Sequence, residues 1–304
     1  MARSYTTGLM AVILLCLCNS CGILSKSQTD AIQRFSVACD SFSATPGRII
    51  HELSSLRTER GTYYAASLST PELRLEELEN LRKTDYSDEK QAKKMDLHYE
   101  ILKKYMRALR SLSHENRYAD LSREFRSLGK NLDSLIFEYN SLELTKSLPT
   151  GIGKAAGEIF GIGARQWMRH RQLRQVKTFV SEGDTLVALL TQSLREGINA
   201  PALDTFLESE ARGQRADYLS YLNHKKEVPP AEDLLFLERL DRLDALKTLR
   251  TQSLRAALSL RNTHRTLYTS LHSRKKISDF YHQLILFEED LAEIQKNLHK
   301  IKNL

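Results

Sequence analysis

The chain has 304 residues, of which 41% are hydrophobic and 27% charged, and its formal net charge is +7. This composition supplies enough apolar material for a sizeable core and excludes an intrinsically disordered protein. Apolar residues recur at spacings of three and four, whereas alternating runs of Val, Ile and Thr are almost absent, so we expect an all-α fold.

The N-terminus has the pattern of an export signal. Met1–Gly8 carries one basic residue, Arg3, and Leu9–Cys18 is an unbroken apolar run, followed by Asn19 and Ser20. A basic start, an apolar core and a small residue before a cleavage site are typical of a secretory signal peptide. A run of this length is too short to span a bilayer, which needs about 20 apolar residues.

The end of this segment suggests a lipid anchor. Leu14, Leu15 and Leu17 approach Ser20-Cys21-Gly22, with Cys18 at the third position before Cys21. This ending resembles the lipobox of bacterial lipoproteins, particularly those of Bacteroidota, although the lipobox prefers Leu where Cys18 stands. The resemblance implies cleavage after residue 20 and acylation of the Cys21 thiol, with ordinary secretion as the alternative.

The resemblance also implies a location. Some surface lipoproteins of Bacteroidota carry an acidic cluster directly after the acylated cysteine, but residues 22–29 contain no acid. We therefore expect an outer-membrane, lipid-anchored protein that faces the periplasm. The mature chain would retain one thiol, Cys39, which precludes an intramolecular disulfide. Cys39 shares a helical stripe with Ile32, Phe35 and Phe42, which favours a small core residue.

Residues 21–86 are interpreted as an N-terminal linker followed by short helices. The apolar spacing predicts helices over 30–43 and 48–67, and a third over 71–83. That third helix has a clear start, because Thr70 can act as N-cap, Pro71 suits the first helical position and Glu72 lies in the first turn. Ser87 is then expected to begin a long-helix coiled-coil region over 87–304.

Two heptad seams support this long-helix region. Each seam repeats apolar residues at alternating spacings of three and four, which is the pattern of coiled-coil packing. The first consists of Tyr118, Leu121, Phe125, Leu128, Leu132, Leu135, Tyr139 and Leu142, and the second of Ile277, Phe280, Leu284, Phe287, Leu291, Ile294, Leu298 and Ile301. Between Leu237 and Leu249 leucines recur every three residues, which predicts a helix with neighbours on several sides.

We expect the second half to fold back at 227–230 into an elongated antiparallel helical bundle. Residues equidistant from Pro229 would then face each other. A basic face formed by Arg165, Arg169, Arg171, Arg174 and Lys177 would lie opposite the acidic residues 288–293, and the basic stretch 245–278 opposite acids that include Asp184 and Asp204. Straight arms of 70 residues would make a rod of about 100 Å, but a helix break at 197–201 would undo the farther pairings.

The Gly-rich segment 151–163 lacks the features of a phosphate-binding loop, because Leu148 and Ala155 occupy the positions of an essential Gly and Ser or Thr. Gly153, Gly157 and Gly161 instead share one helix face. Such a face permits close helix packing inside the bundle. It could also serve self-association or membrane contact, since Trp167 and several basic residues follow it.

No residue pattern predicts catalysis. The nine His residues are scattered, the carboxylates lie on charged helix faces, and we expect no metal site and no cofactor. A nucleic-acid partner is not expected, because basic and aromatic residues do not interleave. We therefore expect a membrane-tethered envelope lipoprotein that acts as a scaffold or adaptor for an unknown envelope protein. The alternative is a membrane-active protein that inserts 151–163 into a lipid surface or an oligomer.

Overall fold

The computed structural model describes residues 24–42, 46–113, 121–141, 147–154, 172–199, 201–225, 227–273 and 277–302. The described residues form helices and connecting turns without any strand, which confirms the all-α fold class. The longer helices are α2 (Lys26–Phe42), α3 (Pro46–Ser67), α4 (Pro71–Ser113), α5 (Leu121–Ser141), α8 (Gln172–Ile198), α9 (Pro201–His224), α10 (Pro230–His272) and α11 (Ile277–Lys302).

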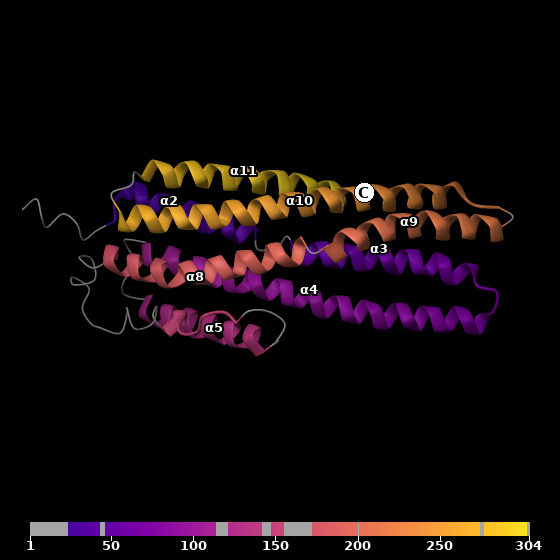
Figure 1. Cartoon of the computed structure of the whole chain (residues 1–304), viewed down its shortest axis with the longest axis horizontal. Coiled ribbons are helices and arrows are strands. Elements are labelled where there is room, and N and C mark those ends of the chain that lie inside the picture. Colours follow the sequence, from indigo (N-terminus) through magenta and orange to yellow (C-terminus); the bar gives the residue numbers. More distant parts are fainter. Residues whose placement is uncertain are drawn as a thin grey trace, which may run out of the picture.

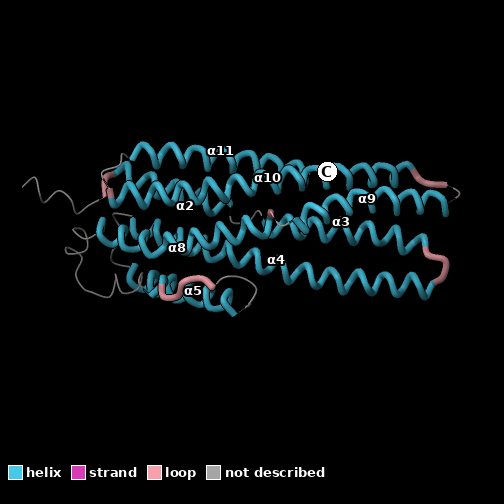
Figure 2. The backbone as a smooth tube through the Cα atoms, in the orientation of Figure 1, coloured by secondary structure: helices cyan, strands magenta, loops and turns pink. Residues whose placement is uncertain are grey.

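These helices form an elongated antiparallel bundle (Figure 1). Helix α2 followed by α3, and α8 followed by α9, make two long rows that run beside the 43-residue helices α4 and α10. We call the end where α2 begins the proximal end. The opposite end, where α3 and α9 end and α4 and α10 begin, is the distal tip, and Figure 2 shows the connecting loops there.

The two halves of the bundle differ in thickness. In the proximal half, α5 packs against α4, while α11 packs against α10 and α2. Helix α5 stops in the proximal half, whereas α11 runs past the middle of α10, where Asn297 donates to the carbonyl oxygen of Ala245. The distal half is built mainly of α3, α9 and the first parts of α4 and α10. Among these, α3 contacts α4, α9 and α10 and is therefore the central helix of the distal half.

The proximal core is built on aromatic side chains. Phe35 of α2 makes edge-to-face contacts with Phe280 and Phe287 of α11, at ring-centroid distances of 5.9 and 6.0 Å. Phe42 contacts Phe287 in the same way and also reaches Tyr99 of α4. Cys39 is fully buried in this core, and burial raises the pKa of its thiol well above the ordinary value. The prediction of Cys39 as a core residue is confirmed.

Helix α4 begins as predicted but ends much later. The backbone N–H of Leu73 donates to Oγ1 of Thr70 at 3.3 Å, so Thr70 caps the helix. The predicted end near residue 83 is wrong, because α4 continues to Ser113. A cap-like sequence such as 87–89 starts a helix only where backbone N–H groups lack partners, and inside a continuous helix the preceding turn already satisfies them.

The predicted seams agree with the buried faces. In α11 every seam residue from Phe280 to Ile301 is buried. In α5, Leu132 and Tyr139 are buried and Leu128 and Leu135 are half-buried, whereas Tyr118 and Leu142 lie outside the described residues. Helix α10 packs against α11, α8, α3 and α9, which confirms the expectation of several neighbours.

The predicted charge pairing holds in part. Asp184 of α8 pairs with Arg261 and Arg265 of α10, and Arg250 pairs with Asp204 of α9, so these arms are antiparallel as expected. The break at 197–201 is real, because α8 ends at Ile198 and α9 begins at Pro201.

The pairing of 288–293 with the basic face was wrong. Helix α11 lies on α10 and α2, so Glu288 pairs with Arg34 of α2 and Asp290 with Arg255 of α10. The cause is an additional helix end in the second arm. Helix α10 ends at Ser273, whose backbone is extended and whose N–H donates to the carbonyl oxygen of Thr269. Because the second arm is divided there, its longest straight part is α10, which extends about 65 Å instead of 100 Å.

Candidate functional site

Most of the residues predicted to contact membrane or partner lie outside the described part of the chain. These are Cys21, Gly157, Gly161, Arg165, Trp167, Arg169 and Arg171. Gly153, Arg174 and Lys177 are described. Arg174 is exposed on α8 and Lys177 is half-buried there, and α11, which was expected to supply their acidic partners, packs elsewhere.

Gly153 lies in a segment that is fastened to α5. Its N–H and that of Lys154 donate to the carboxylate of Asp133 at 2.9 and 2.8 Å. Asn140 of α5 exchanges two hydrogen bonds with the backbone of Leu148. A Cβ on Gly153 would overlap the carbonyl oxygen of Gly129, so the absence of a side chain allows two backbones to touch. At residue 153, the close-packing interpretation matches the geometry.

A buried polar network joins α4, α8 and α10. The Tyr105 hydroxyl lies 2.8 Å from Nε2 of His264, and Nδ1 of His264 lies 3.3 Å from Oδ1 of Asp184. A neutral imidazole satisfies both contacts, because Nδ1–H donates to the carboxylate while Nε2 accepts from the hydroxyl. Burial lowers the pKa of His264, and this outweighs the opposing effect of Asp184. Burial opposes ionisation of Asp184, but hydrogen bonds from His264 and Arg261 hold its pKa well below the usual value.

This network positions helices and is closed to a substrate. Tyr105 and His264 are both fully buried and only Asp184, whose side chain is 15% exposed, reaches solvent, so the Tyr–His pair itself has no open face toward a substrate. Gly183 makes room for it, because a Cβ there would overlap the ring and hydroxyl of Tyr105. Sequence reasoning missed the network, since its members are single polar residues far apart along the chain.

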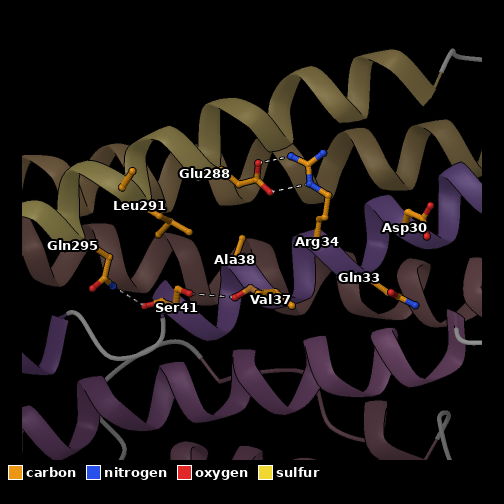
Figure 3. Close-up of a pocket in the computed structure, with 10 residues that line it drawn as sticks. Asp30, Gln33, Arg34, Val37, Ala38, Ser41, Glu288, Leu291 and Gln295 are labelled. Carbon is orange, nitrogen blue, oxygen red and sulfur yellow. Dashed lines mark hydrogen bonds and ion pairs between the residues drawn. The ribbon is translucent and has the colours of Figure 1, made fainter.

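A shallow groove of about 600 Å³ runs between α2 and α11 (Figure 3). Val37, Ala38 and Leu291 form its apolar part. Arg34 bridges it through two hydrogen bonds to Glu288, of 3.2 and 2.6 Å. This ion pair holds helices α2 and α11 together. It crosses the groove and divides it, but the groove remains open to solvent.

The distal tip contains a second aromatic cluster that is not part of the proximal core. Tyr63 of α3 contacts Tyr221 edge-to-face at 5.0 Å, and Tyr218 stacks on Phe236 at 4.4 Å. Arg239 is buried beneath it, with its guanidinium 4.1 Å from the centre of the Tyr63 ring. Burial and the carboxylate of Glu232 raise the pKa of Tyr63. This cluster joins α3, α9 and α10 at the tip.

The surface of the distal tip carries exposed apolar side chains at high density. Leu234 of α10 is 67% exposed and Leu75 of α4 is 60% exposed. Further exposed residues of the tip are Tyr64, Leu73, Leu78, Leu219, Leu235 and Leu237. Patches of this kind mark interaction sites in proteins. The tip is also acidic, because residues 59–83 and 208–241 together contain 13 acids against 9 Lys and Arg.

Sequence reasoning noticed Leu237 only as part of a helix with several neighbours and did not single out the tip. The available signal was that Leu73, Leu75 and Leu78 fit no heptad, so that one helix neighbour cannot cover all of them.

Two kinds of site are not found among the described residues. No described helix has an apolar stretch long enough to cross a bilayer. Within the same residues, no group of three or more His, Cys, Asp or Glu side chains is placed to bind a metal ion. No protein-family model matches the chain, and neither does any curated protein or solved structure.

Proposed function

We propose that the protein is a lipid-anchored envelope protein that acts as a scaffold or adaptor, holding an apolar, acidic tip away from the membrane. The observation that carries the proposal is the separation of the proximal end from the distal tip by the length of the bundle (Figure 1). Residue 21 precedes the first described residue, Leu24, by three positions, so an anchor there would lie at the proximal end. The exposed leucines of the tip lie at the other end.

The proposal assigns recruitment of a protein partner and no chemical reaction to the tip. The net negative charge of the tip would repel anionic lipid headgroups and attract a basic protein surface. The proposed location is the periplasmic face of the outer membrane. The exposed leucines would supply the apolar contact at the centre of the interface.

Metabolic labelling tests the anchor. Cells that express the protein are grown on a labelled fatty acid, and we expect the label on the wild type and its complete loss in Cys21→Ser. Cys16→Ser, which changes a thiol of the apolar run outside the lipobox, is the matched control and should retain the label. An unlabelled wild type that separates from membranes would refute the anchor.

The adaptor role is tested separately from the anchor. Envelopes are cross-linked and the protein is recovered with its neighbours, comparing the wild type with Leu234→Asp, which changes the most exposed leucine of the tip. We expect a specific neighbour that disappears in Leu234→Asp. Loss of the same neighbour in Val37→Asp, a change at the exposed Val37 of the α2–α11 groove, would move the contact away from the tip.

One observation favours a second candidate function, insertion of the Gly-rich segment into lipid. Phe137 on α5, the helix that holds residues 147–154, is 74% exposed. Exposed Trp, Phe and Leu side chains on a helix surface are typical of helices that lie in a membrane interface. Dye release from liposomes that is abolished by Gly157→Asp and reduced by Phe137→Ser would favour this function over the scaffold.

A further inference from the structure

We infer that the protein pairs with a second copy of itself through the first part of α4, in an antiparallel contact at the distal tip. The inference depends on the surface of the bundle and not on acylation of Cys21. It goes beyond the adaptor role, because it names a partner for a surface that the adaptor contact at Leu234 does not use.

Within the described residues, the first part of α4 packs against α3. Leu81 packs against Gly61 of α3, where a Cβ on the glycine would overlap the leucine side chain. The side-chain contacts of α4 with α2 and α8 involve residues farther along the helix, such as His98, Tyr99 and Tyr105. Figure 1 shows the first part of α4 along the outer edge of the distal half. Leu75 and Leu78 are therefore left exposed.

One stripe of this helix combines the exposed leucines with charges of both signs. Successive residues of a helix are turned by about 100°, so Glu72, Leu75, Leu78, Glu79 and Arg82 fall within an arc of about 120°. Leu81, which faces α3, lies outside this arc. Within the described residues, neither Glu72 nor Arg82 takes part in an ion pair.

The stripe is complementary to a copy of itself. If two α4 helices lie antiparallel around a two-fold axis near residue 77, Glu72 of each copy faces Arg82 of the other, and the leucines at 75 and 78 meet between the two ion pairs. A two-fold contact requires this property, since each residue must suit the partner residue across the axis. The charges select the antiparallel direction, because a parallel pair would place Glu72 against Glu72.

The other exposed stripe of the tip lacks this property. On α10, Leu234 and Leu237 lie beside Glu238 and Asp241, and two copies of that stripe would repel each other. Self-pairing is therefore assigned to α4, and the stripe on α10 remains for a basic partner.

The contact is expected to be weak. The stripe covers residues 71–84, which is about 20 Å of helix. Two such stripes bury less accessible surface than a stable interface, which buries about 1,200–2,000 Å². Because the helices pair antiparallel at the tip, the two proximal ends point in opposite directions.

Charge reversal tests the contact in the protein from Gly22 onward, which keeps every described residue. Sedimentation equilibrium is measured from low to high micromolar concentration, with helicity by circular dichroism as the check of folding. We expect a concentration-dependent dimer that Leu75→Asp abolishes. Glu72→Arg alone and Arg82→Glu alone should each weaken it roughly tenfold, because both ion pairs of the dimer become like-charge pairs.

A double variant and one mixture decide whether the charges meet across the axis. The double variant Glu72→Arg/Arg82→Glu, and an equimolar mixture of the two single variants, should both regain the affinity of the wild type. Leu73→Asp, Arg74→Glu and Leu234→Asp change exposed residues outside the stripe and should leave the dimer intact. A wild type that stays monomeric at all concentrations, or a dimer that survives Leu75→Asp, would overturn the inference.

Discussion

At the scale of single residues, the side chains that matter most are polar groups buried without access to solvent. His264 has Asp184 and Tyr105 as hydrogen-bond partners, and Arg261 and Arg265 also reach Asp184 from α10. A buried histidine with this surrounding is stable as a neutral imidazole, because two neighbouring guanidinium groups and burial disfavour the imidazolium. Protonation of His264 should therefore destabilise the folded protein.

The first prediction concerns the dependence of stability on pH. Since the pKa of His264 is lower in the folded protein than its ordinary 6.5, the unfolded chain binds a proton at a pH where the folded chain does not. The free energy of unfolding should therefore decrease as the pH falls below about 6.5. Asp184, whose pKa is lowered from 3.8, adds a further loss at more acidic pH.

Thermal or urea unfolding between pH 7.5 and 5 measures this effect. His264→Gln should be less stable than the wild type at pH 7.5 but should lose less stability on acidification. His299→Gln, a change at an exposed position of α11, should reproduce the slope of the wild type. Equal slopes for wild type and His264→Gln would mean that other groups cause the acid sensitivity.

At the scale of helices, two contacts between helices rely on arginine. Arg60 of α3 donates to Glu210 and Asp217 of α9 at 2.8 and 2.7 Å, and the Glu210 side chain is 1% exposed. Arg34 of α2 makes a pair of similar length with Glu288 of α11, but both side chains are much more exposed. The two pairs look alike in distance and differ in how much water surrounds them.

The second prediction follows from that difference. Arg60→Met leaves the buried carboxylate of Glu210 without its cation, so we expect a loss of about 3 kcal/mol in the free energy of unfolding. Arg34→Met breaks an exposed pair and should cost less than about 1 kcal/mol. Denaturant unfolding of both variants under the same ionic strength measures them. Equal losses would show that burial does not control these pairs.

How far the sequence predicts an element depends on what surrounds it. Helix α11 could be predicted residue by residue, because every seam position from Phe280 on meets a neighbour. The reversal after His272 could not, since residues 270–278 contain no Gly or Pro to signal a turn. The exposed leucines at the tip were also missed, because exposure depends on where α5 and α11 stop.

At the scale of the whole molecule, the bundle is unequal from end to end. The proximal half contains most of the large, fully buried side chains, among them Phe35, Phe179, Phe280 and Tyr105. The distal tip lacks both α5 and α11, and the distal half is held by the Tyr63 cluster and ion pairs such as that of Arg242 with Glu59. Apolar burial stabilises more than exposed or half-exposed ion pairs do, so the two halves should differ in local stability.

The third prediction is a gradient of backbone opening along the rod. Hydrogen exchange of the monomer, at low protein concentration, should be at least about tenfold faster in the first part of α4 and in α9 than in α8 and α11. The reason is that opening the distal half exposes a smaller core. Uniform protection along the rod would mean that it opens as one unit.

Arg60→Met turns this gradient into a causal test, because it changes a contact of the distal half alone. Exchange should accelerate in α3 and α9 while α11 and α2 keep their protection, and Arg34→Met should show the opposite localisation or no change. If Arg60→Met instead accelerated exchange equally in α11, the two halves would be coupled through α10, which spans both. A tip that opens independently leaves its surface adaptable for binding while the anchored half stays folded.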